Sequence, residues 1–437
     1  MKSSKAEIQA KYHKIPVIRF EDQKLSSFSG LLIFQVLFRQ LRLRERLKKC
    51  FEHMKVSPIF GRHLVVLLLI VHLLLGFRRL REVDYYRDDP LVLRPLDSGP
   101  GLGRGLLARD SATDSRGRPE RAKRVEGRRK WGPGLARGAP LMGLRKLPDV
   151  STISRALCQM EGEGVEKVRE LSTPMVIEGL KREALYRLTF DFDGSVQSTK
   201  GHAEETAVGF NKTKKGARSY YPLFCTVAQS GQFFDLLHRP GNVHDSNGAD
   251  EFMMQCFQKA RAALPNILFE SLMDSAFFSQ NTLVSLGSSH VKFTASMPFE
   301  RFPELKSMIE QRNRWRVIDR EWAYFETQWK PKSWDTSYRF LFIRKKVKSR
   351  QKGPLQLHLF EPRDLHFDYK VIVTNKTESA KSVVLFHNGR GSQETIFGDA
   401  KTDAALDALP STRLAGNQIF TLCAMMAHNL SREIQML

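Results

Sequence analysis

The sequence has few of the features that mark zinc-binding, secreted or membrane-spanning proteins. Its five cysteines are scattered without a CxxC pair, so neither a zinc site nor a disulfide framework is indicated. Residues 1–13 are polar and charged and no apolar core follows them, which predicts no signal peptide and a cytoplasmic location. The most apolar run, residues 64–75, is shorter than the roughly 20 residues of a spanning helix, so it predicts a buried helix rather than a membrane segment.

Acidic residues are also scarce relative to basic ones. Lys and Arg number 70 against 47 Asp and Glu, which gives a formal charge of +23. This excess favours a polyanionic partner such as double-stranded DNA, with a membrane surface as the alternative. At 437 residues the chain has room for two or three domains.

Three of the acidic residues stand at positions that indicate chemistry. Asp193 and Asp274 each end an apolar, β-prone run. Residues 386–401 are predicted to form one helix, and a stripe of such a helix would be apolar if it faced the core. At about 100° per residue, one stripe of it instead holds four polar side chains: His387, Arg390, Glu394 and Lys401.

Two aspartates at strand ends and a glutamate on a helix can converge on one site. Carboxylate oxygens are the ligands that Mg²⁺ prefers, and two such ions about 3.5 to 4 Å apart assist an in-line attack at phosphorus. Asp193 is preferred over Asp191 because it directly precedes a Gly-Ser turn, although the two share one strand face. The structural alternatives are a turn residue at Asp193 and a helix-capping residue at Asp274.

The order Asp193, Asp274, Glu394 resembles the DDE transposases of bacterial insertion sequences. It is most similar to the group with a β-rich insertion before the glutamate, whose signature is Tyr, two residues, Arg, three residues, Glu, six residues, Lys. Arg390, Glu394 and Lys401 have that spacing, and His387 stands at the tyrosine position. The resemblance covers roughly residues 14–94 and 142–437, and Leu272 stands where the family leads us to expect a basic side chain.

The resemblance implies a metal-dependent transposase that cleaves DNA and transfers the strand. The three acids would be catalytic and would hold two Mg²⁺ (or Mn²⁺) ions. Arg390 and Lys401 would position phosphates, and His387 would contact DNA. The implied partners are the terminal inverted repeats and the target DNA, bound by a homodimer in the bacterial nucleoid. A catalytically decayed, DNA-binding transposase and an RNase H-like metal nuclease are the alternatives.

The expected fold is α/β, with an RNase H-like mixed sheet, a helical N-terminal DNA-binding region and a β-rich insertion. Strands are predicted at residues 185–196, 220–227, 232–238 and 291–296, and a helix at 248–264. The predicted parts are a helical region (1–94), a Gly/Pro/Arg-rich disordered insertion (95–141), the end of the DNA-binding region (142–182), the catalytic core (183–298 and 376–437) and the β-rich insertion (299–375). A native basic linker is the alternative for residues 95–141.

Several basic side chains outside the helix 386–401 are candidate DNA contacts. Residues 147–158 are predicted to form a turn and a short helix capped by Ser151 or Thr152, either a recognition helix or an ordinary helix of a bundle. Residues 26–51 and 77–89 are predicted to be helical, with Pro90 as a stop, and residues 414–432 to form a helix behind the sheet. The candidate contacts are Arg155 on the short helix and Lys212, Lys214, Lys215 and Arg218 on a basic turn.

Four tryptophans within twenty residues of the insertion are interleaved with Arg and Lys. They are Trp315, Trp322, Trp329 and Trp334. Such aromatic side chains can stack on an extruded base, as the resemblance allows, or pack a small β-core.

Overall fold

The computed structural model describes residues 26–54, 60–93, 146–199, 201–209, 211, 214–346 and 367–436. The predicted insertion at 95–141 and the predicted DNA contact Lys212 lie outside these residues. The chain divides into two compact units, residues 1–35 with 86–147 and residues 36–85 with 148–437. The second unit contains the sheet and the candidate site.

Helices occupy most of the described N-terminal part. They are α2 (Leu31–Gln40), α3 (Leu43–Cys50), α4 (Arg62–Leu74), the 3₁₀ helix η1 (Leu80–Tyr86) and α5 (Pro90–Leu93). The predicted helix 26–51 is interrupted, because Arg42 adopts a left-handed conformation with φ of 48°. Pro90 begins α5 rather than ending a helix, since its fixed φ suits the first helical position.

The most apolar run forms α4, and this helix is buried as predicted. All nine residues from Val65 to Leu73 are buried, and α4 packs against α3 and α13 (Leu414–Met436). Within the described ranges, no helix combines the length and the apolar character needed to cross a membrane.

We expect His72, within α4, to make stability pH-dependent. Burial lowers the pKa of His72 to about 4, although the nearby Glu82 carboxylate and a hydrogen bond to the Arg79 backbone act to raise it. The unfolded chain takes up this proton near pH 6.5 and the folded chain only near pH 4, so stability falls as the pH drops through that window. In the His72→Leu variant, up to about 3 kcal/mol of this pH-dependent loss of unfolding free energy should be absent.

Urea titrations of the unfolding free energy at several pH values would measure this effect. The comparison uses the slope of the unfolding free energy against pH. A constant difference in packing between leucine and histidine therefore does not affect it. An identical slope for both proteins between pH 6.5 and 4 would show that His72 is not the group responsible.

The helices before the sheet are α6 (Val150–Cys158) and α7 (Gly162–Arg182). Asp149 occupies the N-cap position of α6, so Ser151 and Thr152 lie in its first turn and the predicted caps are wrong by two to three residues. The exposed Arg155 guanidinium donates hydrogen bonds to Ser151 O and Thr152 Oγ1 within the same helix.

Five strands form the RNase H-like core, which confirms the predicted fold class. They lie in the order β6 (Gln232–Leu237), β5 (Leu223–Val227), β1 (Arg187–Gly194), β7 (Leu268–Met273) and β8 (Lys292–Met297). β7 is parallel to β1 and β8 to β7, whereas β5 is antiparallel to both β1 and β6. Helices α8 (Ala249–Ala263) and α9 (Gln280–Ser288) connect these strands.

The strands predicted for the β-rich insertion extend this same sheet. They are β9 (Arg316–Val317), β10 (Trp322–Trp329), β11 (Tyr338–Lys346) and β12 (Phe367–Thr374), preceded by η3 (Phe299–Arg301) and α10 (Pro303–Glu310). β12 pairs antiparallel with β8, with Val371 opposite Met297, which gives one nine-stranded sheet. Val371 and Val373 pack into the core cluster of the other strands, so β12 shares the core of the catalytic strands.

The four clustered tryptophans pack in or against the apolar core. Trp334 stacks on Phe278 with ring centroids 4.8 Å apart, and Trp315 meets Phe325 edge-on at 4.8 Å. This arrangement supports the packing interpretation over base stacking.

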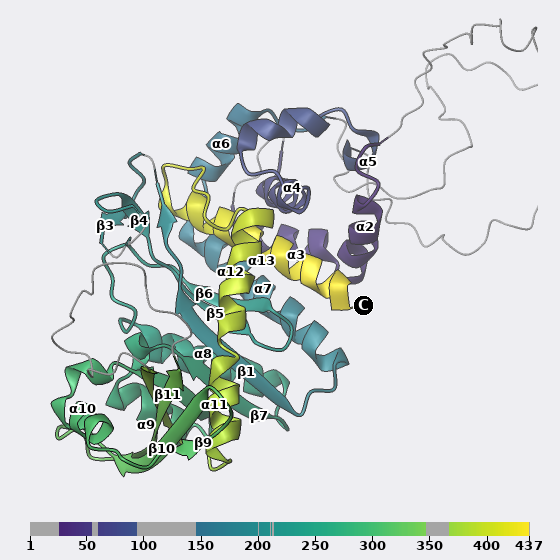
Figure 1. Cartoon of the computed structure of the whole chain (residues 1–437). Helices are drawn as coiled ribbons and strands as arrows, with labels where there is room; N and C mark the ends of the chain where they lie inside the picture. Colours follow the sequence, from purple (N-terminus) through teal and green to yellow (C-terminus); the bar gives the residue numbers. More distant parts are fainter. Residues whose placement is uncertain are drawn as a thin grey trace, which may run out of the picture. The chain divides into compact units, whose positions relative to one another are not determined.

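The two faces of the sheet differ in chemistry. On β1, Phe190 and Phe192 enter an apolar core shared with α8 and α9. Asp191 and Asp193 point to the other face, across which α11 (Ala380–Asn388) and α12 (Gly391–Asp403) lie (Figure 1). The alternation of β1 thus puts carboxylates beneath these two helices.

The predicted strand 220–227 is divided between two sheets. Its first residue belongs to β4 (Arg218–Tyr220) of a small sheet with β2 (Gln197–Ser198) and β3 (Ala207–Val208), and the rest forms β5.

α13 packs against α4, α6, α7 and β6, as predicted for a helix behind the sheet. The Asn429 side chain accepts a hydrogen bond from Phe233 N and donates one to Phe233 O, both at 2.8 Å, so it replaces a missing strand neighbour of β6.

Candidate active site

Asp193 and Asp274 meet at one edge of the sheet. Asp193 is the penultimate residue of β1 and Asp274 directly follows β7. These strands are parallel, with Phe192 opposite Met273, so their carboxyl ends lie side by side. Asp274 also caps η2 (Ser275–Phe277), and its carboxylate accepts a hydrogen bond from Ala276 N.

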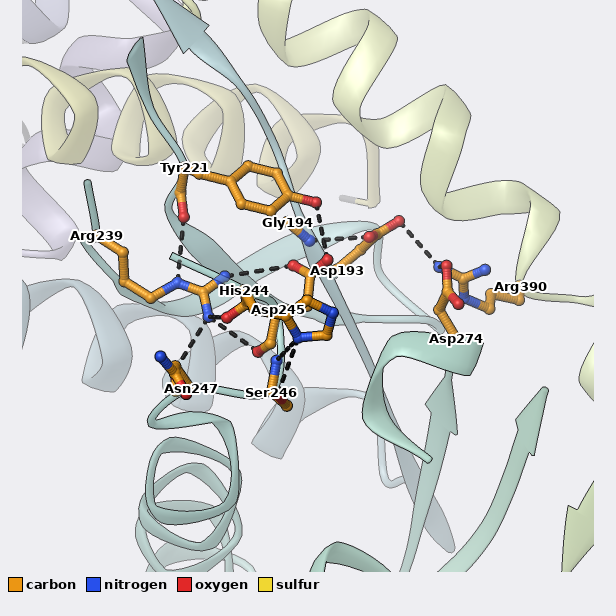
Figure 2. Close-up of polar contacts among 10 residues, drawn as sticks. All are labelled: Asp193, Gly194, Tyr221, Arg239, His244, Asp245, Ser246, Asn247, Asp274 and Arg390. Carbon is orange, nitrogen blue, oxygen red and sulfur yellow. Dashed lines mark hydrogen bonds and ion pairs between the residues drawn. The ribbon is translucent and has the colours of Figure 1, made fainter. Parts of the chain in front are cut away.

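The Arg390 guanidinium lies between these two aspartates. Its Nη2 is 2.9 Å from Asp193 Oδ2 and 3.7 Å from Asp274 Oδ2 (Figure 2). Its Nε is 3.5 Å from Asp191 Oδ1, and Asp191 is only 2% exposed. One guanidinium therefore faces three carboxylates, including that of Asp191, which was not the predicted ligand.

Arg390 occupies the junction of two helices rather than the middle of one. The predicted helix 386–401 is interrupted between Asn388 and Gly391, where Arg390 N bonds His387 O in a tighter, three-residue turn. The prediction of one polar stripe is therefore wrong. Arg390 enters the aspartate cluster, whereas His387 is buried against β8.

Burial dominates the electrostatics of the cluster. It raises the pKa of Asp193 to about 6, with Arg390 acting against it and Asp274 adding to it. Burial also raises the pKa of Asp191 well above its usual range. For Asp274, burial is outweighed by hydrogen bonds from Ser275 and Ala276 and by Arg390, so its pKa is lowered. One arginine thus leaves the negative charge only partly compensated.

This donor set fits a hard divalent cation in its chemistry. Asp193 and Asp274 supply carboxylate oxygens at one edge, and the buried Asp191 Oδ1 accepts no hydrogen bond from the described residues. However, no three Asp, Glu, His or Cys side chains in the described ranges form a group that could hold a metal ion. Glu394 is exposed in the first turn of α12 and does not complete such a group.

Gln393 fixes the start of α12 to the sheet. Its Nε2 donates hydrogen bonds to Asp191 O at 3.1 Å and to Thr226 Oγ1 at 3.0 Å. This buried contact anchors the first turn of α12 to β1 and β5, although nothing in the signature spacing indicated a role for Gln393.

His387 contacts β8 through both ring nitrogens. Nδ1 lies 3.0 Å from Thr294 Oγ1 and Nε2 lies 3.0 Å from Ser296 Oγ, and the residue is 1% exposed. Burial lowers its pKa well below the usual value, and Lys370 and Arg390 add to this effect. A direct contact with DNA would require the end of α11 to leave the sheet.

The comparison of the sequence with protein families decides which family this site belongs to. The family described as "Transposase DDE domain group 1" matches residues 139–437, more than half of the chain. The chain is a member of the DDE transposase family. Members of this family generally use divalent metal ions. No curated protein matches this chain in a comparison of sequences.

Solved structures similar to this chain include two DNA complexes. One is the piggyBac transposase synaptic complex with hairpin DNA, at 11% identity and a TM-score of 0.35, covering 57% of this chain and 48% of that one. Another is the Mos1 transposase paired-end complex with the left transposon end, at 9% identity and a TM-score of 0.18, covering 33% and 50%. This chain thus spans about half the length of either structure.

The other predicted DNA contacts of the chain lie away from the aspartates or on exposed turns. Lys401 is in the last turn of α12, with Nζ 5.9 Å from the Phe397 ring centroid. Lys214 and Lys215 are exposed before β4. Arg218 donates hydrogen bonds to Thr206 O and Oγ1. Their roles in DNA binding stay predictions.

Lys370 on β12 is a cation near the site that sequence reasoning missed. Its pKa is lowered by burial and by Arg390, with Asp274 acting in the opposite direction. Lys370 shares a strand face with Ile372, which lies opposite Ser296, the partner of His387. The alternation of β12 was visible in the sequence, but its pairing with β8 was not.

Proposed function

We propose that this transposase cleaves DNA at the terminal repeats of a bacterial insertion sequence and transfers the freed strand to target DNA. The observation that supports this best is the meeting of Asp193, Asp274 and Arg390 at the carboxyl edge of an RNase H-like sheet, with Glu394 one helical turn beyond. The reaction is water attack on the phosphodiester, followed by attack of the 3′-hydroxyl on the target.

Asp193, Asp274 and Glu394 would hold divalent ions, Mg²⁺ or Mn²⁺, which supply charge stabilisation at phosphorus and activation of the nucleophile. Arg390 compensates the carboxylates in the structure described here. It would transfer to a DNA phosphate when the carboxylates take up cations, because a planar guanidinium suits either partner. The interrupted hydrogen bonding at residues 388–391 is the hinge that would let Glu394 approach the aspartates.

The proposed partner is duplex DNA, bound by a homodimer because two transposon ends must be paired. The excess of basic residues supports a polyanionic partner.

Cleavage of labelled DNA tests this function. The substrates are duplexes from the DNA that flanks the reading frame of this protein, incubated with Mg²⁺ or Mn²⁺. We expect metal-dependent nicking at a repeat boundary by the natural protein and its loss in Glu394→Gln. The uncharged amide keeps the shape of the side chain but is a poor ligand for a hard cation.

A decayed transposase that only binds DNA is the second candidate. It is favoured by the absence of Glu394 from a metal-binding group in the described structure. Repeat binding without nicking by either protein would select it, and nicking that persists in Glu394→Gln would refute the role of the glutamate.

A further inference from the structure

A second polar cluster lies beside Asp193, in the connection between β6 and α8. β6 runs in the same direction as β1, because both are antiparallel to β5. The residues after β6 therefore leave the sheet at the same edge as Asp193 and Asp274, where ligands of open α/β sheets bind. We define residues 244–247 (His244, Asp245, Ser246 and Asn247) as the tip loop.

Arg239 fixes the backbone of the tip loop. This buried side chain donates from Nη1 to the carbonyls of His244 (3.3 Å), Asp245 (2.9 Å) and Asn247 (3.1 Å), as Figure 2 shows. Its Nε donates to Tyr221 O at 3.1 Å. A single guanidinium thus sets the conformation of the loop and ties it to Tyr221, between β4 and β5.

Tyr221 and Asp245 of the tip loop lie close to Gly194, the residue after Asp193. Tyr221 OH donates to Asp245 Oδ2 at 3.1 Å, and Arg239 Nη2 is 3.4 Å from Asp245 Oδ1. A Cβ added to Gly194 would lie 2.5 Å from Tyr221 Cζ and 2.7 Å from Asp245 Oδ1. Only glycine therefore allows this packing directly after Asp193.

The exposed side of the tip loop offers polar, hydrogen-bonding side chains. His244, Ser246 and Asn247 are exposed, whereas the charge of Asp245 is compensated by Arg239. His244 Nδ1 accepts a hydrogen bond from Ser246 N at 3.3 Å within the loop. Such groups match the phosphate and sugar oxygens of DNA, and the acid of the tip loop, Asp245, is paired with Arg239.

We propose that the tip loop is a DNA-contacting element of the active site, with His244 and Asn247 meeting the DNA backbone beside the scissile phosphate. Arg239 is a positioning residue that acts through the loop. A loop that only supported Asp193 would need Tyr221 and Asp245, but not three hydrogen bonds that fix its exposed tip. This inference rests on the proposed function, since it presumes that DNA occupies the edge near Asp193.

Equilibrium binding without divalent metal tests the proposal, because cleavage then cannot interfere. The probes are the labelled duplexes that flank the reading frame. The double variant His244→Asn, Asn247→Ala should bind them roughly tenfold or more weakly, with an unchanged Tm. The control His290→Asn changes an exposed histidine before β8, at the opposite edge of the parallel strands, in a left-handed conformation that asparagine tolerates. It should bind normally.

Arg239→Gln provides the test of positioning. If Arg239 acts through the tip loop, adding this change to the double variant should weaken binding little further, whereas an independent structural effect would add in full. Normal binding by the double variant would overturn the proposal while leaving the proposed function intact. Failure of the natural protein to bind any probe would overturn both.

Discussion

Replacing Asp193 by asparagine is expected to abolish DNA nicking, whereas the same change at Asp191 should leave most of it. Both carboxylates face Arg390 from one side of β1. Asp193 is 29% exposed in its side chain and lies at the strand end, so DNA and a shared cation can reach it. Asp191 is buried beneath α12, where Gln393 binds its carbonyl.

The expected magnitudes separate the two variants clearly. Losing a carboxylate ligand removes several kcal/mol of transition-state stabilisation, so nicking by Asp193→Asn should fall roughly a thousandfold or more. Asp191→Asn should stay within about tenfold of the natural protein, since it changes one buried charge beside Arg390. Rates of nicking of the same labelled duplex provide the measurement.

Binding of the duplex is the control for both variants, and it should be unchanged. Full nicking by Asp193→Asn would refute its assignment. The reverse pattern, with loss only in Asp191→Asn, would transfer the ligand role to the buried residue.

The strands and the positions of the aspartates could be predicted because they depend on local pattern. β1 alternates apolar and polar residues and ends at Gly194, so both the strand and the shared face of Asp191 and Asp193 follow from a period of two. Asp274 follows an apolar run in the same way. The parallel pairing of β1 and β7 then brings the two ends together, as the resemblance implied.

The surroundings of Arg390 could not be predicted because they depend on contacts between distant segments. Helical spacing gave the angles among His387, Arg390 and Glu394, but not which side faces the sheet or where the helix breaks. The break follows from two anchors, His387 on β8 and Gln393 on β1. Each has a partner more than ninety residues away in the sequence.

The continuity of the nine-stranded sheet was hidden for the same reason. The sequence predicted a β-rich insertion, but only the pairing of Val371 on β12 with Met297 on β8 joins its strands to the core. A long gap before Glu394 therefore indicated an insertion without showing that its strands continue the catalytic sheet. Lys370 approaches the site only because of that pairing.

A buried ion pair also depends on the pairing of β12 with β8. Replacing Lys376, one member of this ion pair, by methionine should be among the most destabilising changes in the chain. Lys376 follows β12 and pairs with Glu270 on β7, and their side chains are 4% and 1% exposed. Thr189 Oγ1 donates to Glu270 Oε2 at 2.9 Å, and Lys376 Nζ lies 3.9 Å from the Phe386 ring centroid on α11. The pair thus joins β1, β7, β12 and α11.

Methionine preserves the length of the lysine side chain but leaves the Glu270 charge buried without its close partner. The only other cation within 4.0 Å of it among the described residues is Arg187, at that limit. We therefore expect the unfolding free energy to fall by about 3 to 5 kcal/mol. Adding Glu270→Gln should recover much of this loss, because no buried charge then remains.

Urea unfolding of the natural protein, both single variants and the double variant measures the coupling. A double variant as unstable as the sum of the singles would show that the pair does not act as a unit, and the strands would then be held by packing alone.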